Sequence, residues 1–265
     1  MIKGKVKECI EKRHSVRAYE KKEIPNEIID SIVKFIEELQ NPFSDKVKIK
    51  IVKQGYSEES KKLGTYGVIK GASNFLVCVC EDKEFDYVAL GYALEKVILY
   101  CTSLGLGTCW IGGTFNKGNF AKAVSLNKNQ ILPIISPIGY KAEKKSFIAS
   151  VFSKTTGKRK PFSEIFFNND FNTSLKVNEA AEYGEVLEMV RLAPSAVNNQ
   201  PWRVIKENNN YHFYIDGKVE ISKIDIGIAL SHFHLMTEEL GLKGIFKNQK
   251  PDIKSNYEYI VSWIV

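Results

Sequence analysis

Two clusters of basic residues have the composition of a phosphate-binding site. The first contains Arg13, His14, Ser15 and Arg17, and the second is Lys158-Arg159-Lys160. Guanidinium groups offer planar, paired donors and a hydroxyl offers one more, so these residue types suit a ligand that carries a phosphate. Taken alone, the first cluster is more typical of a solvated surface turn, and the second is equally typical of either.

A polar loop near residue 200 has the composition of a binding loop. Residues 193–202 read APSAVNNQPW. Ser195, Asn198 and Gln200 supply hydroxyl and amide groups, and the flanking prolines restrict the loop, so it loses little conformational freedom when a ligand binds. The alternative is a turn that ends a helix, with Trp202 packed on the core.

The pair Gly112-Gly113 is a third candidate, because backbone without side chains can approach a planar ring closely. A plain turn after a strand at residues 107–111 explains this pair equally well. The nearby Gly105-x-Gly107 is not a dinucleotide fingerprint, since it follows a helix and lacks the third glycine before a second helix.

Composition disfavours several classes of protein. The chain has 265 residues, of which 44% are hydrophobic, and its net charge of +7 comes from lysines interleaved with glutamates along the whole chain. Aromatic residues do not alternate with the basic clusters, so nucleic acid binding is not favoured. The five cysteines lie in apolar segments without a C-x-x-C pair, which predicts reduced thiols and no metal site. Neither a membrane span nor a secretory signal is visible, so we expect a cytoplasmic protein.

Hydrophobic periodicity predicts helices and strands in two groups. In the first group we expect helices at residues 25–40 and 85–104, and strands at 47–52, 74–80 and 131–138. In the second group we expect helices at 177–192 and 226–240, and strands at 203–206 and 211–215. Residues 141–176 are polar and lack steady periodicity, so we expect them to connect the two groups.

Two of these helices share a pattern that favours an internal duplication. Gly91 and Gly227 are each followed by Ala, Leu, Leu, Gly and Leu at offsets of 2, 3, 13, 14 and 15 residues. Because these residue types are common, the match alone favours a duplication only slightly.

Four segments resemble motifs of the FMN-dependent nitroreductases. Residues 13–19 (RHSVRAY) are similar to the N-terminal motif of that family, and residues 193–202 are similar to its A-P-S-x-x-N-x-Q-P-W flavin loop. The other two segments are residues 105–113 (GLGTCWIGG) and 158–165 (KRKPFSEI). The resemblance covers most of the chain. It implies an α+β, nitroreductase-like fold with two related lobes, each with a mixed or antiparallel sheet flanked by helices.

The resemblance also implies that the chain binds FMN. This cofactor has a phosphate dianion, a hydroxylated ribityl chain and a planar ring, so its site needs cations, hydroxyl or amide partners, and backbone that can approach the ring. We therefore expect the following residues to bind FMN: Arg13, His14, Ser15, Arg17, Trp110, Ile111, Gly112, Gly113, Lys158, Lys160, Pro194, Ser195, Ala196, Asn198 and Gln200.

The order of the motifs departs from the family pattern. Other members carry the A-P-S-x-x-N loop soon after the first helix, whereas here residues 40–44 (QNPFS) stand there and the loop comes about 150 residues later. The family forms homodimers with flavin sites at the interface, so the resemblance implies that this chain is a fused dimer. We expect lobes at residues 1–140 and 177–265 joined by residues 141–176, one complete site between the lobes, and an empty pseudo-symmetric site.

The expected activity is the transfer of electrons from NADH or NADPH to a small acceptor such as a nitroaromatic or a quinone, by ping-pong hydride transfer at flavin N5. The cofactor carries this chemistry, so we expect no catalytic side chain. A covalent connection makes association of the lobes intramolecular, so a monomer is expected to hold a complete site. Two alternatives remain: a protein that stores flavin or senses ligands, and a family member with another flavin reaction such as dehalogenation or dehydrogenation.

Overall fold

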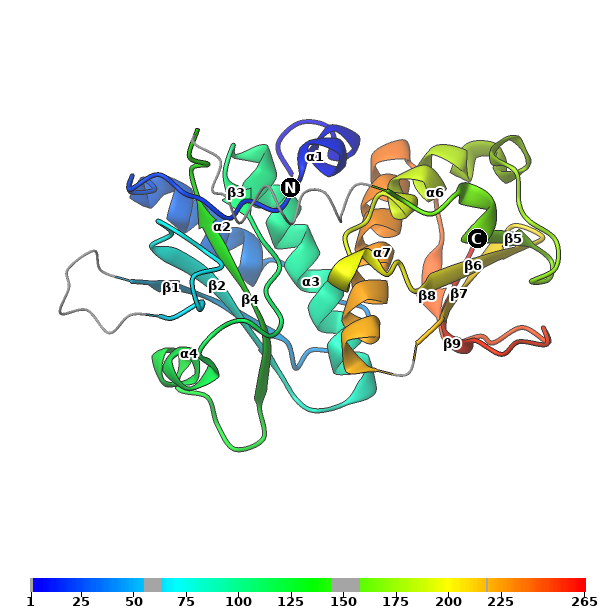
Figure 1. Cartoon of the computed structure of the whole chain (residues 1–265). Coiled ribbons are helices and arrows are strands. Elements are labelled where there is room, and N and C mark those ends of the chain that lie inside the picture. Colours follow the sequence, from blue (N-terminus) through cyan, green and yellow to red (C-terminus); the bar gives the residue numbers. More distant parts are fainter. Residues whose placement is uncertain (1, 55–62, 144–157, 218) are drawn as a thin grey trace.

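The computed structural model of the chain describes residues 2–54, 63–143, 158–217 and 219–265. It is an α+β fold in which two sheets lie on either side of a central pair of long helices, α3 and α7 (Figure 1). The expected fold class, with two sheets flanked by helices, is confirmed.

The first sheet has the strand order β1-β2-β4-β3, and its neighbouring strands are antiparallel. The strands are β1 (Lys48–Lys53), β2 (Asn74–Cys80), β3 (Gly107–Thr108) and β4 (Ile131–Gly139). Strand β2 is buried along its whole length because its alternate residues pack into two hydrophobic clusters, one on each face of the sheet. Strand β1 lies at the edge and has partly exposed residues. The accompanying helices are α1 (Val6–Lys12), α2 (Asn26–Glu37), α3 (Glu84–Ser103) and α4 (Lys117–Val124).

The second sheet has the order β5-β6-β7-β9-β8, with β5 parallel to β6 and the other neighbours antiparallel. Its strands are β5 (Phe166–Asn168), β6 (Trp202–Glu207), β7 (Asn210–Ile215), β8 (Ile245–Lys247) and β9 (Glu258–Ile264). The helical segments are η1 (Phe162–Glu164), η2 (Val177–Tyr183), α6 (Gly184–Arg191), η3 (Ala196–Asn198) and α7 (Glu220–Leu240).

Most of the expected elements are present, with three differences. The helix expected at 177–192 divides into a 3-10 segment, η2, and the helix α6, because Ala181 has a positive φ of 50° that interrupts regular helix. Helix α7 begins at Glu220, six residues earlier than expected. Within the expected connection, Phe166–Asn168 forms β5 of the second sheet, and residues 144–157 lie outside the described part of the chain.

The two central helices pack closely because each has a glycine at the crossing point. A Cβ atom on Gly91 would lie 2.0 Å from the carbonyl oxygen of Ile224, and one on Gly227 would lie 2.1 Å from that of Val88. Each glycine therefore contacts the residue three positions before the other glycine, which is the reciprocal pattern of a two-fold contact. The sequence pattern shared by these two helices is thus accompanied by a reciprocal contact at their crossing point.

None of the described helices is both long enough and apolar enough to cross a bilayer.

Candidate functional site

A cavity of about 770 Å³ lies between the two halves of the molecule. Its walls come from the N-terminal segment, the segment after β3, the turn before β6 and one face of α7. Among the predicted site residues, those that line it are Ser15, Arg17, Trp110, Ile111, Gly112, Gly113, Pro194, Ser195, Ala196 and Asn198. The fold therefore brings the first basic cluster, the glycine pair and the polar loop to one cavity.

The N-terminal wall is an extended segment that runs beside β3. Ser15 pairs with Thr108 in a parallel bridge, and the N–H of Val16 donates to the carbonyl of Thr108 at 2.8 Å. Val16 is buried against Gly107, where a Cβ atom would lie 2.7 Å from the Val16 side chain. Because side chains alternate along extended backbone, Ser15 and Arg17 are left to face the cavity.

The segment after β3 forms the second wall. Ile111 exchanges two backbone hydrogen bonds of 3.0 Å with Ile135, which fixes the segment to β4. Gly113 has open space where a Cβ would stand, whereas a Cβ on Gly112 would lie 3.1 Å from the Ile134 side chain. The neighbouring Cys109 thiol also lines the cavity, and burial raises its pKa.

The turn before β6 forms the third wall and contains unusual backbone. Val197, Asn198 and Gln200 have φ values of 46°, 59° and 49°, in the left-handed region. This conformation costs a residue with a Cβ about 1–2 kcal/mol, and it persists only where surrounding contacts hold it. Val197 is 94% exposed at the mouth of the cavity, so the valine gains no burial in return.

Several hydrogen bonds hold this turn. The N–H of Ala196 donates to both carboxyl oxygens of Asp225, at 3.0 and 3.2 Å, and the N–H of Gln200 donates to the Ser195 hydroxyl at 2.9 Å. The Gln200 side chain is buried and accepts from the N–H of Lys160 at 2.8 Å. Gln200 thus supports the turn from behind and does not line the cavity.

The second basic cluster packs against the same turn. The Lys158 carbonyl accepts from the Asn198 amide at 2.8 Å, and the Lys160 ammonium donates to the Gln200 carbonyl at 3.4 Å. The guanidinium of Arg159 bonds the Asn198 side-chain oxygen and, at 2.9 Å, the Leu192 carbonyl. Arg159, and not the lysines on either side of it, is therefore the cation of this cluster whose side chain reaches a cavity residue.

The charge around Arg159 is unbalanced. Burial, with Arg13 and Arg191 nearby, lowers its pKa to about 10. Arg191 pairs with Glu188, and Arg13 lies 3.9 Å from Glu95. A region of partly buried positive charge therefore lies beside the turn, and an anionic group would stabilise it.

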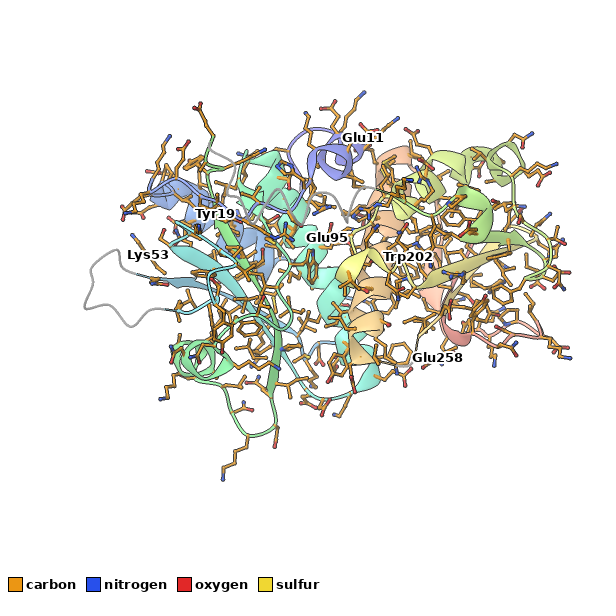
Figure 2. All side chains as sticks on the ribbon, in the orientation of Figure 1. Glu11, Tyr19, Lys53, Glu95, Trp202 and Glu258 are labelled. Atoms are coloured by element: carbon orange, nitrogen blue, oxygen red, sulfur yellow. The ribbon has the colours of Figure 1, made fainter. Side chains whose placement is uncertain are left out.

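Arg13 contributes to a buried network in the middle of the molecule and does not line the cavity. Glu95 on α3 is fully buried in the middle of the molecule (Figure 2). Its carboxyl oxygens accept 2.9 Å hydrogen bonds from the Trp110 indole and the His232 ring. The other His232 nitrogen lies 2.8 Å from the Met189 carbonyl. The network thus links α3 to α7 and α6 and orients Trp110 at the cavity wall.

His14 lies on the outer side of the N-terminal segment. Its ring nitrogens lie 3.0 Å from the Lys12 carbonyl and 3.0 Å from the Lys141 ammonium. With Arg13 it lines a separate hollow of about 170 Å³. Of the predicted site residues, Arg13, His14, Lys158, Lys160 and Gln200 are therefore not among those that line the cavity.

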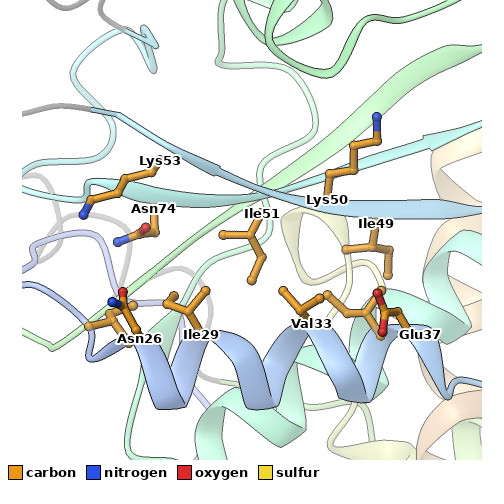
Figure 3. A pocket seen from close by; sticks show the side chains of 11 residues that line it. Asn26, Ile29, Val33, Glu37, Ile49, Lys50, Ile51, Lys53 and Asn74 are labelled. Carbon is orange, nitrogen blue, oxygen red and sulfur yellow. The ribbon is translucent and has the colours of Figure 1, made fainter.

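Another cavity, of about 480 Å³, lies between α2 and β1 and is remote from these motifs. Ile29 and Val33 of the helix point toward Ile49 and Ile51 of the strand (Figure 3). None of the predicted site residues lines it, so we do not place the chemistry there.

Sequence reasoning missed the wall formed by α7. Its lining residues are Ile221, Ile224, Asp225 and Ile228, at the spacing of one helix face. The expected start of this helix at residue 226 concealed that spacing. Asp225 is the most informative omission, because it is a buried carboxyl group that holds the Ala196 turn.

The comparison with protein families shows the family to which the chain belongs. A family model described as "Putative TM nitroreductase" matches residues 5–237, which is most of the chain. The chain belongs to this nitroreductase family. No match was found among curated proteins.

Several solved structures are similar to this chain. This chain is similar to a "putative nitroreductase" from Thermotoga maritima, with 25% sequence identity and a TM-score of 0.64. The match covers 100% of this chain and 95% of the Thermotoga chain. A nitroreductase with bound FMN from Bacteroides fragilis is 21% identical and covers 54% of this chain and 92% of its own, with a TM-score of 0.44. A nitroreductase family protein from Clostridium difficile is 17% identical and covers 61% of this chain and 95% of its own, with a TM-score of 0.46.

Proposed function

We propose that this protein is an FMN-dependent oxidoreductase that passes electrons from NADH or NADPH to a small acceptor such as a nitroaromatic or a quinone. The observation that carries the proposal is the cavity itself. It joins Ser15 and Arg17 to the turn at Pro194–Asn198, although these two motifs lie about 180 residues apart in the sequence. Membership of the nitroreductase family supports the reaction class.

The residues of the cavity fit the parts of FMN. The isoleucines of α7 and the exposed backbone of Gly112 and Gly113 suit a planar ring, because they offer an apolar surface and amide groups without obstructing side chains. The cavity volume of about 770 Å³ lies within the range of cofactor sites. Ser15, Ser195 and Asn198 provide hydroxyl and amide partners for the ribityl hydroxyls.

Positive charge suits the phosphate. Arg17 lines the cavity, and Arg159 bonds Asn198 at its edge. Since burial and neighbouring arginines already lower the pKa of Arg159, a phosphate dianion would relieve the repulsion among these cations. We place Arg17 and Arg159 at the phosphate, and we assign Lys158, Lys160 and Gln200 to support of the turn.

Bound FMN would supply the hydride chemistry, and the protein would bind, orient and shield it. In this proposal the Trp110 ring, fixed by Glu95, limits one wall, and the α7 isoleucines exclude water from another. One site would form per chain between the two lobes, so the chain would act as a fused dimer, with each lobe supplying one motif.

The test is a titration of the purified protein with FMN, FAD and riboflavin, followed by visible absorption and flavin fluorescence. We expect FMN to bind most tightly. Arg17→Ala should weaken FMN about 10- to 100-fold, because one charge-assisted contact contributes about 1.5–3 kcal/mol, and should weaken riboflavin much less. Lys128→Ala, at an exposed lysine outside the cavity lining, is the matched control.

Equal losses for FMN and riboflavin would contradict the phosphate role of Arg17. Oxidation of NADH or NADPH with a quinone or nitroaromatic separates an enzyme from a flavin-storage protein. Failure to bind any flavin would overturn the proposed function as a whole.

A further inference from the structure

Asp225 stands out among the groups that line the cavity. It lies on the α7 face formed by Ile221, Ile224 and Ile228. Among the described residues that line the cavity, it is the one with a carboxyl side chain. The side chain is buried, with 3% of the residue exposed. A carboxyl group on an otherwise aliphatic wall needs a chemical reason, because burying an ionised carboxylate is costly.

The hydrogen-bond partner of Asp225, a backbone N–H, carries no charge that could balance an ionised carboxylate. One N–H, that of Ala196, is shared between the two carboxyl oxygens at 3.0 and 3.2 Å. A carboxylate has about four acceptor positions, so this single donor leaves most of its capacity unused. Within the described residues, no lysine, arginine or histidine forms an ion pair with it.

The charged groups on the surrounding elements have other partners or lie across the cavity. On α7, Lys223 pairs with Glu84 of α3 and Glu258 of β9 at 3.3 and 3.4 Å. Further along α3, Glu95 is bound by Trp110 and His232. The N-terminal segment contributes Arg17, the segment after β3 contributes the Cys109 thiol, and the cavity-lining residues of the 194–198 turn carry no charge.

We propose that Asp225 binds the flavin ring as a neutral carboxylic acid and donates a hydrogen bond to an acceptor atom of that ring. This inference rests on the proposed function. An uncharged ring that fills the cavity excludes water from the wall, which disfavours the ionised form, while the ring's carbonyl oxygens and ring nitrogens accept the proton's hydrogen bond. The other carboxyl oxygen continues to accept from Ala196.

The free protein is already close to this state. Burial raises the pKa of Asp225 to about 7, so the acid and the carboxylate coexist near neutral pH before a ligand binds. Binding of the ring then raises the pKa further and takes up one proton wherever the free protein is ionised. Affinity should therefore be constant below about pH 7 and should fall as pH rises above it, approaching tenfold per pH unit.

Riboflavin is the appropriate probe because it lacks the phosphate of FMN, whose second pKa near 6 would add its own pH dependence. Fluorescence titrations from pH 6 to 8.5 should show the decline in wild-type affinity. Asp225→Asn keeps an oxygen for Ala196 and gains a permanent N–H donor, so its riboflavin affinity should not change with pH. Asp216→Asn, at an exposed carboxylate that pairs with Arg203, should retain the wild-type slope.

A second measurement does not depend on any variant. Calorimetry of riboflavin binding at pH 8, in buffers with different ionisation enthalpies, should show uptake of close to one proton by the wild type. No proton uptake, a flat wild-type profile, or an Asp225→Asn profile with the wild-type slope would each overturn the role of Asp225 while leaving flavin binding intact. Absence of riboflavin and FMN binding at every pH would overturn the proposed function and this inference with it.

Discussion

The two sides of the central helix pair are built on matching positions but have different contents. When Gly227 is matched with Gly91, 136 residues earlier, Asp225 corresponds to Ala89 and Ile228 corresponds to Tyr92. On one side the helix face lines a cavity of about 770 Å³. On the other side the matching face is covered by aromatic rings.

That aromatic cluster consists of Phe43, Tyr92 and Phe246. The Phe43 ring centroid lies 5.3 Å from that of Tyr92 and 5.2 Å from that of Phe246. The turn that carries Phe43 is fixed by Asn41, whose amide donates to the Ala89 carbonyl at 2.9 Å, just as the Ala196 turn is fixed at Asp225.

The difference teaches that a helix face with a turn docked on it does not by itself make a site. One helix face and its docked turn line a cavity where the side chains are Asp, Ala and Ile, whereas the other face and its turn are in contact through the rings of Phe43, Tyr92 and Phe246. This packing supports the proposal of one flavin site per chain and an empty pseudo-symmetric position.

The strongest test of the comparison is at the crossing point itself. Gly91→Ala and Gly227→Ala should each lower the free energy of unfolding by about 3 kcal/mol or more, since the added Cβ would meet a backbone oxygen that cannot move without separating the helices. Urea unfolding measures both. Gly113→Ala, where nothing lies within 4 Å, is the control and should be nearly neutral. Very different losses at Gly91 and Gly227 would break the two-fold relation.

A smaller effect is expected in the aromatic cluster. Phe43→Ala should cost about 2 kcal/mol of stability, because a half-buried ring leaves a gap against Tyr92 and Phe246. Its flavin affinity should equal that of the wild type. The control is Phe85→Ala, the same change at an exposed position of α3. A change in flavin affinity in Phe43→Ala alone would place a ligand on this side as well.

The smallest effect concerns pH. Beside the aromatic cluster, burial and then Lys96 lower the pKa of His234 to about 4, so the folded state resists its protonation. The unfolded chain binds that proton near pH 6.5, so stability from this site is complete above 6.5 and is lost as pH falls toward 4. From pH 7 to 5 the wild type should lose roughly 1.5–2 kcal/mol more than His234→Asn, measured by urea unfolding. Equal losses in both proteins would show that His234 is not the group responsible.

On the Asp225 side, stability depends on pH in the opposite direction. Its raised pKa means that the folded state binds a proton more readily than the unfolded chain, so this group's contribution to stability is present below about pH 4 and is lost as pH rises through 7. The two sides of one helix pair thus differ in the direction of their response to acid.

The sequence determined those features that depend on local pattern. Alternation and continuous apolar runs located β1, β2, β4, β6 and β7, and the helix periodicity located α2 and α3. Motif residues at fixed local spacing, such as Ser15 with Arg17 and Pro194 with Ser195, proved to line one cavity. Short elements such as α1, α4 and β8 escaped prediction, because their few apolar residues form neither a sustained alternation nor a repeated helical spacing.

Only the tertiary structure decided which polar groups face the cavity and which support it. Gln200 and Asn198 belong to one motif, yet the left-handed backbone of the turn buries the first and leaves the second at the wall. Asp225 has no motif at all, and its role appears only where α7 meets a turn 29 residues away. The physical reason is that the direction of a side chain, and the water it loses, depend on packing between segments distant in sequence, which local pattern does not encode.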